Sequence, residues 1–417
     1  MKIIIAGAGE VGFHLAKLLS FESHDITLID NKKSSLNIAE NKLDIKTIEG
    51  NSASISVLKN ADVENSDLVV SLTTSETTNF TTCFLSKQLG AKRTIARISN
   101  TEFIKDCNEI DFDLIGIDEL ISPENLAAAE IKLIISESAF TNSHDFDDGI
   151  LKMMAVRLEK NAPFVGKTVM EAASVFPGVH FMPIALKREN SDTTIIPRGN
   201  TIFEIGDHVV FMTTKGGDEE LCKLSGTDLT KIDDVMIMGG GNIGRKVAKK
   251  LSKNFNVKLI EKSKSRAQDL ADRLPEALVI YGDGRNVELL DEENLNNMDA
   301  FISVTGNSET NIMSCLVAKS KGIKKTIALV DNMDYYKLSQ SIGIDTLINK
   351  KLLAANDIFR FVRNGDIVEL AKLNNMDAEI VEFNVSEHSK VLNKKIVNHH
   401  ICLSICEYKN TFISWLI

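Results

Sequence analysis

The chain has 417 residues, of which 43% are apolar and 25% are charged, values typical of a folded globular protein rather than of a disordered chain. Its length predicts several domains, each long enough to build a hydrophobic core. The formal net charge of −10 disfavours nucleic-acid binding, because such a surface repels phosphate backbones, and no apolar run approaches the roughly 20 residues that a bilayer span requires.

The first predicted element is a strand at residues 2–6, which leads into the glycine loop Gly-Ala-Gly-Glu-Val-Gly at 7–12 and then into a helix with apolar residues at Val11, Leu15 and Leu19. A short buried strand, a glycine turn and an amphipathic helix are typical of the opening of a βαβ unit. The first apolar run is too short for the core of a signal peptide, and the six cysteines are scattered along the chain. We therefore expect a cytoplasmic protein with reduced thiols.

Further strands of this half are expected at residues 25–30, 45–48 and 68–72, and Arg97 ends a fifth strand. The second half repeats the first at an offset of 232 residues, beginning with Gly-Gly-Gly-Asn-Ile-Gly at 239–244. Its expected strands are 257–261, 278–280 and 300–304. Self-similarity on this scale indicates a duplication. We predict an α/β fold with two tandem Rossmann-like domains, each with a doubly wound parallel sheet.

A different pattern separates the two copies. Strand-like stretches at 151–158, 180–187 and 208–212 alternate with turn residues, which predicts a small α+β module. The start of this module recurs at 377–384 and 391–396, but the second module looks truncated. We therefore divide the chain into a first Rossmann-like domain at 1–140, an α+β module at 141–224, a second Rossmann-like domain at 232–365 and an incomplete α+β module at 366–417.

The two glycine loops are candidate phosphate sites. In a strand–GxGxxG–helix unit the first glycine permits the turn, the second lets a pyrophosphate approach, and the third packs the helix on the strand, while free N–H groups face the phosphates. The candidate residues are Gly7, Ala8, Gly9, Glu10, Val11 and Gly12 in the first loop and Gly239, Gly240, Gly241, Asn242, Ile243 and Gly244 in the second. The alternative is that the glycines serve packing alone.

An acid follows the second strand of each copy, Asp30 in the first and Glu261 in the second. A carboxylate at this position accepts hydrogen bonds from both hydroxyls of an unphosphorylated ribose, which favours NAD or ATP over NADP. The sequence therefore predicts two adenine-nucleotide sites, with NAD(H) or ATP and ADP as ligands.

Polar residues at the ends of the third and fourth strands complete the candidate sites. The third-strand residues are Asn51 and Ser52 in the first copy and Gly282, Asp283 and Gly284 in the second; the fourth-strand residues are Thr73, Thr74 and Asn79, with Thr305 and Asn311 in the second copy. The third-strand loops cover the adenine edge or are plain turns, and the asparagines contact the ligand or start a helix. Arg97 reaches a phosphate or forms a surface ion pair, and its counterpart is Leu329.

Other chemistry is weakly indicated. The cluster of His399, His400, Cys402 and Cys406 lacks the spacing of a zinc site, and Cys83 and Cys315 are interpreted as core thiols within helices. The sequence has no nucleophile elbow, no HExxH motif and no Tyr-x-x-x-Lys pair. We therefore expect no metal site, no catalytic residues and no enzymatic activity.

This domain order, with GAGEVG and LID in the first half and GGGNIG, LIE and GDG in the second, resembles the TrkA family. Ser122-Pro123-Glu124 and the stretch 361–367 are also similar to that family. The resemblance implies a cytosolic subunit with tandem RCK domains, peripheral at the inner face of the cell membrane and controlled by ATP, ADP or NADH. It also implies a TrkH- or TrkG-like potassium-translocating partner and a homo-oligomer, with a dimer of dimers expected. An NAD-dependent oxidoreductase and a nucleotide or redox sensor with another partner are the alternatives.

Overall fold

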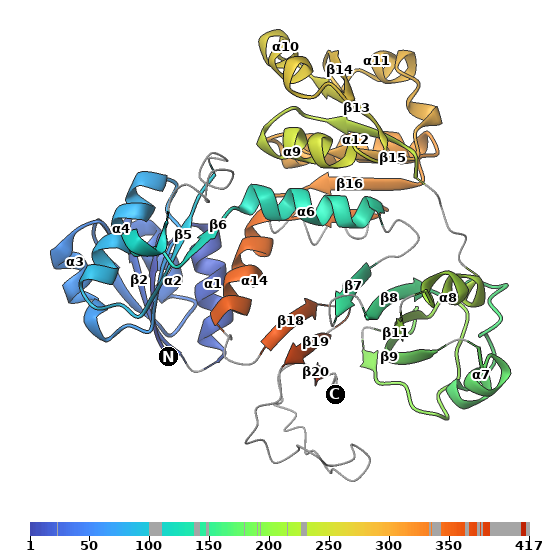
Figure 1. The fold of residues 1–417 in the computed structure, drawn as a ribbon, viewed down its shortest axis with the longest axis horizontal. Helices are drawn as coiled ribbons and strands as arrows, with labels where there is room; N and C mark the ends of the chain where they lie inside the picture. The colour runs from blue at the N-terminus through green and yellow to red at the C-terminus, as the bar shows by residue number, and fades with distance from the viewer. Residues whose placement is uncertain are drawn as a thin grey trace. The chain divides into compact units, whose positions relative to one another are not determined.

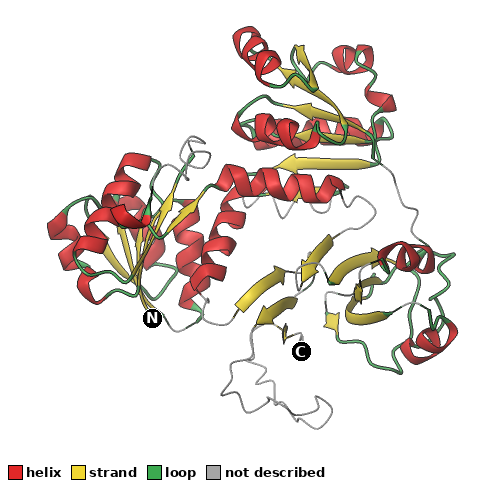
Figure 2. Cartoon of the chain, in the orientation of Figure 1, coloured by secondary structure: helices red, strands yellow, loops and turns green. Residues whose placement is uncertain are grey.

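The computed structural model describes residues 1–22, 24–99, 111–136, 142–146, 150–178, 180–189, 191, 193–214, 216–226, 232–332, 335, 343–362, 367–372, 376, 378–383 and 410–413. The chain folds into two compact units, the first made of Met1–Ile131 and Asp234–Val362 and the second of Lys132–Asp233 and Arg363–Ile417. Figures 1 and 2 show the elements of each unit. The first unit contains both copies of the sequence repeat.

The first copy is a parallel sheet of six strands in the order β3-β2-β1-β4-β5-β6. Its strands are β1 (Lys2–Ala6), β2 (Asp25–Asp30), β3 (Lys46–Glu49), β4 (Leu68–Ser71), β5 (Arg93–Arg97) and β6 (Glu119–Ile121). Its helices are α1 (Glu10–Ser20), α2 (Lys33–Glu40), α3 (Ile55–Asn60) and α4 (Glu76–Gln88), followed by α6 (Pro123–Ser136). Ile3, Ile4 and Ile5 are fully buried because helices cover both faces of the sheet (Figure 2).

The second copy repeats this sheet in the order β14-β13-β12-β15-β16-β17. Its strands are β12 (Asp234–Met238), β13 (Asn256–Glu261), β14 (Ala277–Tyr281), β15 (Ala300–Ser303), β16 (Lys325–Leu329) and β17 (Thr346–Ile348). Its helices are α9 (Asn242–Leu251), α10 (Lys264–Arg273), α11 (Val287–Glu292), α12 (Ser308–Ser320) and α14 (Lys350–Val362). Among the described residues other than glycine, the two with positive φ, Asp62 and Asn294, are 232 positions apart. The predicted tandem Rossmann-like fold is confirmed, and strand ends agree to within one residue.

The last helix of the second copy packs on the first copy. Ala354, Ala355 and Ile358 of α14 are fully buried in one core cluster with Leu15 of α1, and α1 and α14 are in direct contact. Lys351 forms an ion pair with Glu10, and the guanidinium carbon of Arg93 lies 3.8 Å from the centre of the Phe361 ring. Helix α14 therefore joins the two copies.

Helix α6, which follows the first copy, carries the same buried pattern. Ala127, Ala128, Ile131 and Ile135 are buried, and each lies 227 positions before its counterpart in α14, namely Ala354, Ala355, Ile358 and Val362. Figure 1 shows α6 alongside the second copy; burial lowers the pKa of Lys246 on α9, and the charge of Glu124 on α6 opposes this shift. Helix α6 therefore repeats the buried pattern of α14 and lies near α9 of the second copy.

The second unit contains the antiparallel sheet β10-β9-β11-β8-β7 and a sheet of three strands, β18-β19-β20. The strands of the larger sheet are β7 (Asn142–Phe146), β8 (Leu151–Arg157), β9 (Phe181–Lys187), β10 (Thr194–Ile195) and β11 (His208–Thr214), with helices α7 (Val169–Val175) and α8 (Asp218–Ser225). The smaller sheet has β18 (Ile367–Lys372), β19 (Ala378–Phe383) and β20 (Asn410–Ile413). The predicted α+β module is confirmed, whereas residues 391–396 of the predicted second module lie outside the described residues.

Phenylalanines form the core of the α+β module. The ring of Phe164 lies 5.0 to 5.8 Å from the rings of Phe176, Phe181, Phe203 and Phe211. Aromatic contacts of this kind add to the stability gained from apolar burial. Among the described residues, no helix is long and apolar enough to span a bilayer.

We predict that Ile358→Ala and Ile131→Ala each lower the free energy of unfolding by about 2 to 5 kcal/mol, because each leaves a cavity in a fully buried helix contact. Leu133→Ala is the control, since this residue of α6 is 36% exposed and its truncation should cost little. Urea denaturation measures all three. A cost for Ile131→Ala no larger than that of Leu133→Ala would contradict the proposed packing of α6.

A second prediction concerns Glu124 and Lys246, which are 7% and 9% exposed. We expect Glu124→Met to destabilise the fold by about 3 kcal/mol at neutral pH, because it leaves the Lys246 ammonium buried without its counter-charge. The double variant Glu124→Met/Lys246→Met should recover most of this loss. Additive single-variant costs in a double-mutant cycle would show that the two residues do not interact.

The effect of Glu124→Met should also depend on pH. Burial lowers the pKa of Lys246 below its usual 10.5, so the folded protein releases this proton before the unfolded chain does. The contribution of Lys246 to the free energy of unfolding therefore rises with pH between the lowered pKa and 10.5. Loss of the Glu124 charge lowers the pKa of Lys246 further, so the cost of Glu124→Met should shrink as pH rises from the pKa of Lys246 in the variant to its pKa in the parent, which denaturation at pH 7 and pH 9.5 measures.

Candidate nucleotide site

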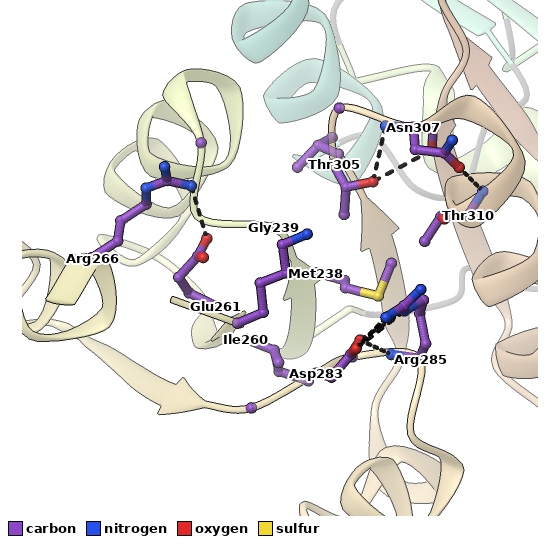
Figure 3. A pocket seen from close by; sticks show the side chains of 16 residues that line it. Met238, Gly239, Ile260, Glu261, Arg266, Asp283, Arg285, Thr305, Asn307 and Thr310 are labelled. Carbon is purple, nitrogen blue, oxygen red and sulfur yellow. Dashed lines mark hydrogen bonds and ion pairs between the residues drawn. The ribbon is translucent and has the colours of Figure 1, made fainter. Parts of the chain in front are cut away.

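The second Rossmann-like domain has a cavity of about 250 Å³ at the carboxyl ends of its parallel strands (Figure 3). Ligands of open parallel sheets bind at this edge, where the strand order reverses between β12 and β15. The predicted residues that line it are Gly239, Gly241, Glu261, Gly282, Asp283, Gly284 and Thr305. Sequence reasoning missed Met238, Ile260, Lys262, Arg266, Arg285, Val304, Gly306, Asn307 and Thr310.

The two glycine loops have the same backbone conformation. Gly7 and Gly239 have φ of +106° and +109°, which side chains rarely adopt. A Cβ on Gly12 or Gly244 would overlap the carbonyl oxygen of Gly7 or Gly239, so the third glycine permits close packing of the helix. A Cβ on Gly9 or Gly241 would meet nothing within 4 Å. The second glycine of each loop is therefore required by no packing contact within the protein.

The remaining loop residues take different positions. Val11 and Ile243 are buried, whereas Glu10 is exposed and paired with Lys351 of α14. The exposed Asn242 is the first residue of α9. The side chains of Val11 and Ile243 point into the core, so these two residues present only their backbone at the helix start.

The acids after β2 and β13 bind the glycine loops. Asp30 accepts a hydrogen bond from the Ala8 N–H at 2.6 Å and one from the Lys32 N–H at 2.8 Å. Glu261 accepts from the N–H groups of Gly240 and Ser263 at 2.9 and 2.8 Å. Glu261 is only 3% exposed, whereas Asp30 is partly exposed. Each acid thus holds its loop through a carboxylate oxygen, in addition to any contact with a ribose.

Acid length and loop residue are matched in each copy. A Cβ on Gly240 would lie 2.9 Å from Oε2 of Glu261 and would overlap the Leu270 side chain. The first copy has alanine at this position, Ala8, opposite an aspartate that is one methylene shorter. Glycine at position 240 therefore leaves room for Leu270 and the longer acid, whereas the first copy combines a shorter acid with a methyl group.

The asparagines of the fourth loop correct one prediction. Oδ1 of Asn311 accepts from the Ser303 hydroxyl, the Thr305 N–H and the Thr305 hydroxyl, and its Nδ2 donates to the carbonyls of Thr305 and Leu329. Asn79 makes the equivalent bonds to Ser71, Thr73 and Arg97. Both asparagines are 1% exposed, and each lies inside its helix rather than at the helix start. Their amides hold the fourth loop in place, and Thr305 lines the cavity whereas Asn311 does not.

The first-copy candidates are arranged as follows. The Ser52 hydroxyl is buried against that of Thr82 at 3.0 Å, and the Asn51 side chain accepts from the Ala53 N–H at 2.9 Å, as in a turn. Thr74 is exposed, and Arg97 is partly buried at the end of β5. Ser52 therefore serves packing.

Asp283 and Arg285 form a bidentate pair at the cavity, with Nε to Oδ1 at 3.0 Å and Nη2 to Oδ2 at 2.6 Å. Hydrogen bonds from the Arg285 side chain lower the pKa of Asp283 to about 2. The first copy has Asn51 and Ala53 at these positions. A position-by-position comparison of the two copies would have singled out this difference.

The cysteines within helices α4 and α12 are core residues, as predicted. Cys83 and Cys315 are buried, and their thiols donate to the carbonyls of Ile95 and Ile327. Burial raises the pKa of both thiols. In the described part of the chain, no group of three or more His, Cys, Asp or Glu side chains could hold a metal ion. The cluster from His399 to Cys406 lies outside it.

Comparison with known protein families identifies these domains. The TrkA-N domain model matches residues 3–123 and 235–350, and the TrkA-C domain model matches residues 153–226. The Trk system potassium uptake protein TrkA of Haemophilus influenzae is 34% identical over 407 residues, which cover 96% of this chain and 87% of that protein. The chain belongs to the TrkA family. A TrkA homolog of Methanosarcina mazei is 33% identical over 95% of this chain and 98% of its own length.

Solved structures of RCK domains share the TrkA fold. The crystal structure of the GsuK RCK domain has a TM-score of 0.63 at 17% identity and covers 93% of this chain and 89% of that chain. The GsuK channel bound to NAD has a TM-score of 0.62 at 18% identity over 87% of this chain. This chain spans 63% of the length of that channel chain. Membership of the TrkA family favours a regulatory protein over the oxidoreductase alternative.

The match between acid length and loop residue generates a prediction for the second TrkA-N domain. Gly240→Ala should lower the free energy of unfolding by about 1 to 3 kcal/mol, because the new methyl group displaces Glu261 or Leu270. Adding Glu261→Asp should restore part of this loss, since it recreates the pair found in the first domain. Thermal and urea denaturation measure both variants, and a Gly240→Ala protein as stable as the parent would contradict the argument.

Proposed function

We propose that this chain is the nucleotide-binding regulatory subunit of a Trk-type potassium uptake system and controls a TrkH- or TrkG-like membrane subunit. The observation that carries the proposal is the pair of GxGxxG loops in which a Cβ on the second glycine would meet nothing within 4 Å, so that no packing contact requires glycine there. Family membership supplies the transport system, because the curated relatives are named as potassium uptake proteins of Trk systems.

The ligands we propose are NAD(H), ATP and ADP. Phosphates would face the free N–H groups at the starts of α1 and α9. The ribose would contact Asp30 or Glu261, and the adenine would lie against the loop that contains Asn51 or Asp283. A related solved channel was determined bound to NAD and another structure of it bound to ADP, which supports this ligand class.

We propose that a bound nucleotide affects the partner first through the helix that follows each glycine loop. Helix α1 carries Glu10 in its glycine loop, and Glu10 pairs with Lys351 of α14 from the other domain. Phosphates bound at the loop would lie near this pair and change its electrostatics. Differential affinity for two arrangements of the domains would then shift their equilibrium.

The assembly we propose is a homo-oligomer, a dimer of dimers, at the cytoplasmic face of the membrane. Its chain consists of the domains 1–140, 141–224, 232–365 and 366–417. The TrkA-N and TrkA-C matches to residues 3–123, 153–226 and 235–350 support the first three of these divisions.

Calorimetric titration of the purified chain with ATP, ADP, NADH and NAD tests the proposal. We expect micromolar binding that Gly9→Asp abolishes at the first site and Gly241→Asp at the second, because each aspartate places a negative charge where phosphate would approach. Both substitutions fit the structure, since their Cβ atoms meet nothing within 4 Å.

Gly178→Asp is the matched control, because its Cβ also meets open space and it lies in the α+β module. It should leave all nucleotide affinities unchanged. Absence of binding of all four nucleotides by the folded parent protein would refute nucleotide control.

A further inference from the structure

The residues that flank the two ribose-facing acids differ in charge. In the second domain the acid Glu261 is followed by Lys262 and then by Arg266 on α10, and all three line the cavity. At the equivalent positions of the first domain, Asp30 is followed by Asn31 and Ser35. Each neutral side chain of the first domain is therefore replaced by a cation in the second.

The position of Arg266 suits it for a ligand anion. Arg266 forms an ion pair with Glu261, in which Nη1 lies 3.6 Å from Oε2, a distance too long for a hydrogen bond, and its side chain is 55% exposed (Figure 3). Glu261 instead accepts hydrogen bonds from two backbone N–H groups and is nearly buried. The carboxylate is thus held by the loop, while the guanidinium keeps its donors available at the mouth of the cavity.

Other cations do not account for the difference in positive charge between the two ribose sites. Lys32 of the first domain corresponds to Ser263, which does not line the cavity of the second domain. Arg285 also lines that cavity, but its Nε and Nη2 are bonded to Asp283, and this aspartate, which replaces the neutral Asn51, balances its charge. Lys262 and Arg266 are therefore the two groups that distinguish the second ribose site.

We propose that the second TrkA-N domain binds adenine nucleotides phosphorylated on the ribose 2′ oxygen, the chemical class of NADPH, whereas the first domain selects the unphosphorylated ribose. Arg266 would bind the phosphate through its planar fork, and Lys262 would add a second positive charge. In the first domain the same phosphate would meet Asp30 without a compensating cation. This inference rests on the proposed nucleotide-binding function and assigns a ligand class to one of its two sites.

Calorimetry with NADPH and NADH, which differ only in this phosphate, tests the proposal in a Gly9→Asp background that leaves the second site alone to be measured. We expect Arg266→Ser to weaken NADPH binding by roughly tenfold or more, because hydrogen bonds to charged groups contribute about 1.5 to 3 kcal/mol, while NADH affinity changes little. Lys262→Asn should act in the same direction.

The matched control is Arg273→Ser, which removes the same charge from the same helix, where Arg273 is paired with Asp269. It should leave the ratio of NADPH to NADH affinity unchanged. In the reciprocal experiment, Asn31→Lys/Ser35→Arg in a Gly241→Asp background should raise the affinity of the first site for NADPH.

The outcomes separate the two proposals. NADH binding at the second site without NADPH binding, or an equal loss of both in Arg266→Ser, would overturn the 2′-phosphate assignment and leave nucleotide control intact. Absence of all nucleotide binding in the parent chain would overturn both.

Discussion

The start of one helix in each TrkA-N domain meets two requirements at once. Helices α1 and α9 begin at the glycine loops, where their unpaired N–H groups favour an anion. The buried flank of α1 also packs against α14, a helix of the other domain, and α9 carries Lys246, which interacts with Glu124 of α6. A phosphate bound at either glycine loop would therefore lie at the start of a helix that also contacts the other domain.

The α14 contact and the α6 contact have the same pattern of buried apolar residues but differ in where their charged residues lie. The α14 contact places its ion pair, Lys351 with Glu10, in partial contact with water. The α6 contact buries Glu124 and Lys246, and Oε2 of the one and Nζ of the other have no hydrogen bond. Buried polar atoms without partners reduce the gain from closing a contact. The two contacts therefore differ in strength, although the duplicated sequence builds both with the same alanines and isoleucines.

Much of this fold is predictable from the sequence because the signals are local. The strand runs, the glycine loops and the acids after β2 and β13 lie at fixed spacings, and the repeat checks each of them. The role of Asn79 was not predictable, because it depends on a hydrogen bond to the Arg97 carbonyl across a neighbouring strand. The exchange of α6 and α14 is likewise a tertiary feature, since an amphipathic helix pattern does not say which domain it covers. Arg266 and Arg285 lie outside any motif, so their place in the lining of the cavity could not be predicted from the sequence.

Duplication leaves some site positions coupled and others free to diverge. A methyl group at position 240 would crowd Leu270 and the longer acid Glu261, so the residue at position 240 is coupled to the acid that ends β13. Positions 262 and 266 carry no such constraint, because Arg266 is half exposed and makes no hydrogen bond that the loop needs. Charge can therefore change there without cost to the fold. The two TrkA-N domains are consequently free to differ in ligand preference at the ribose while they keep the same phosphate loop and the same helix contacts.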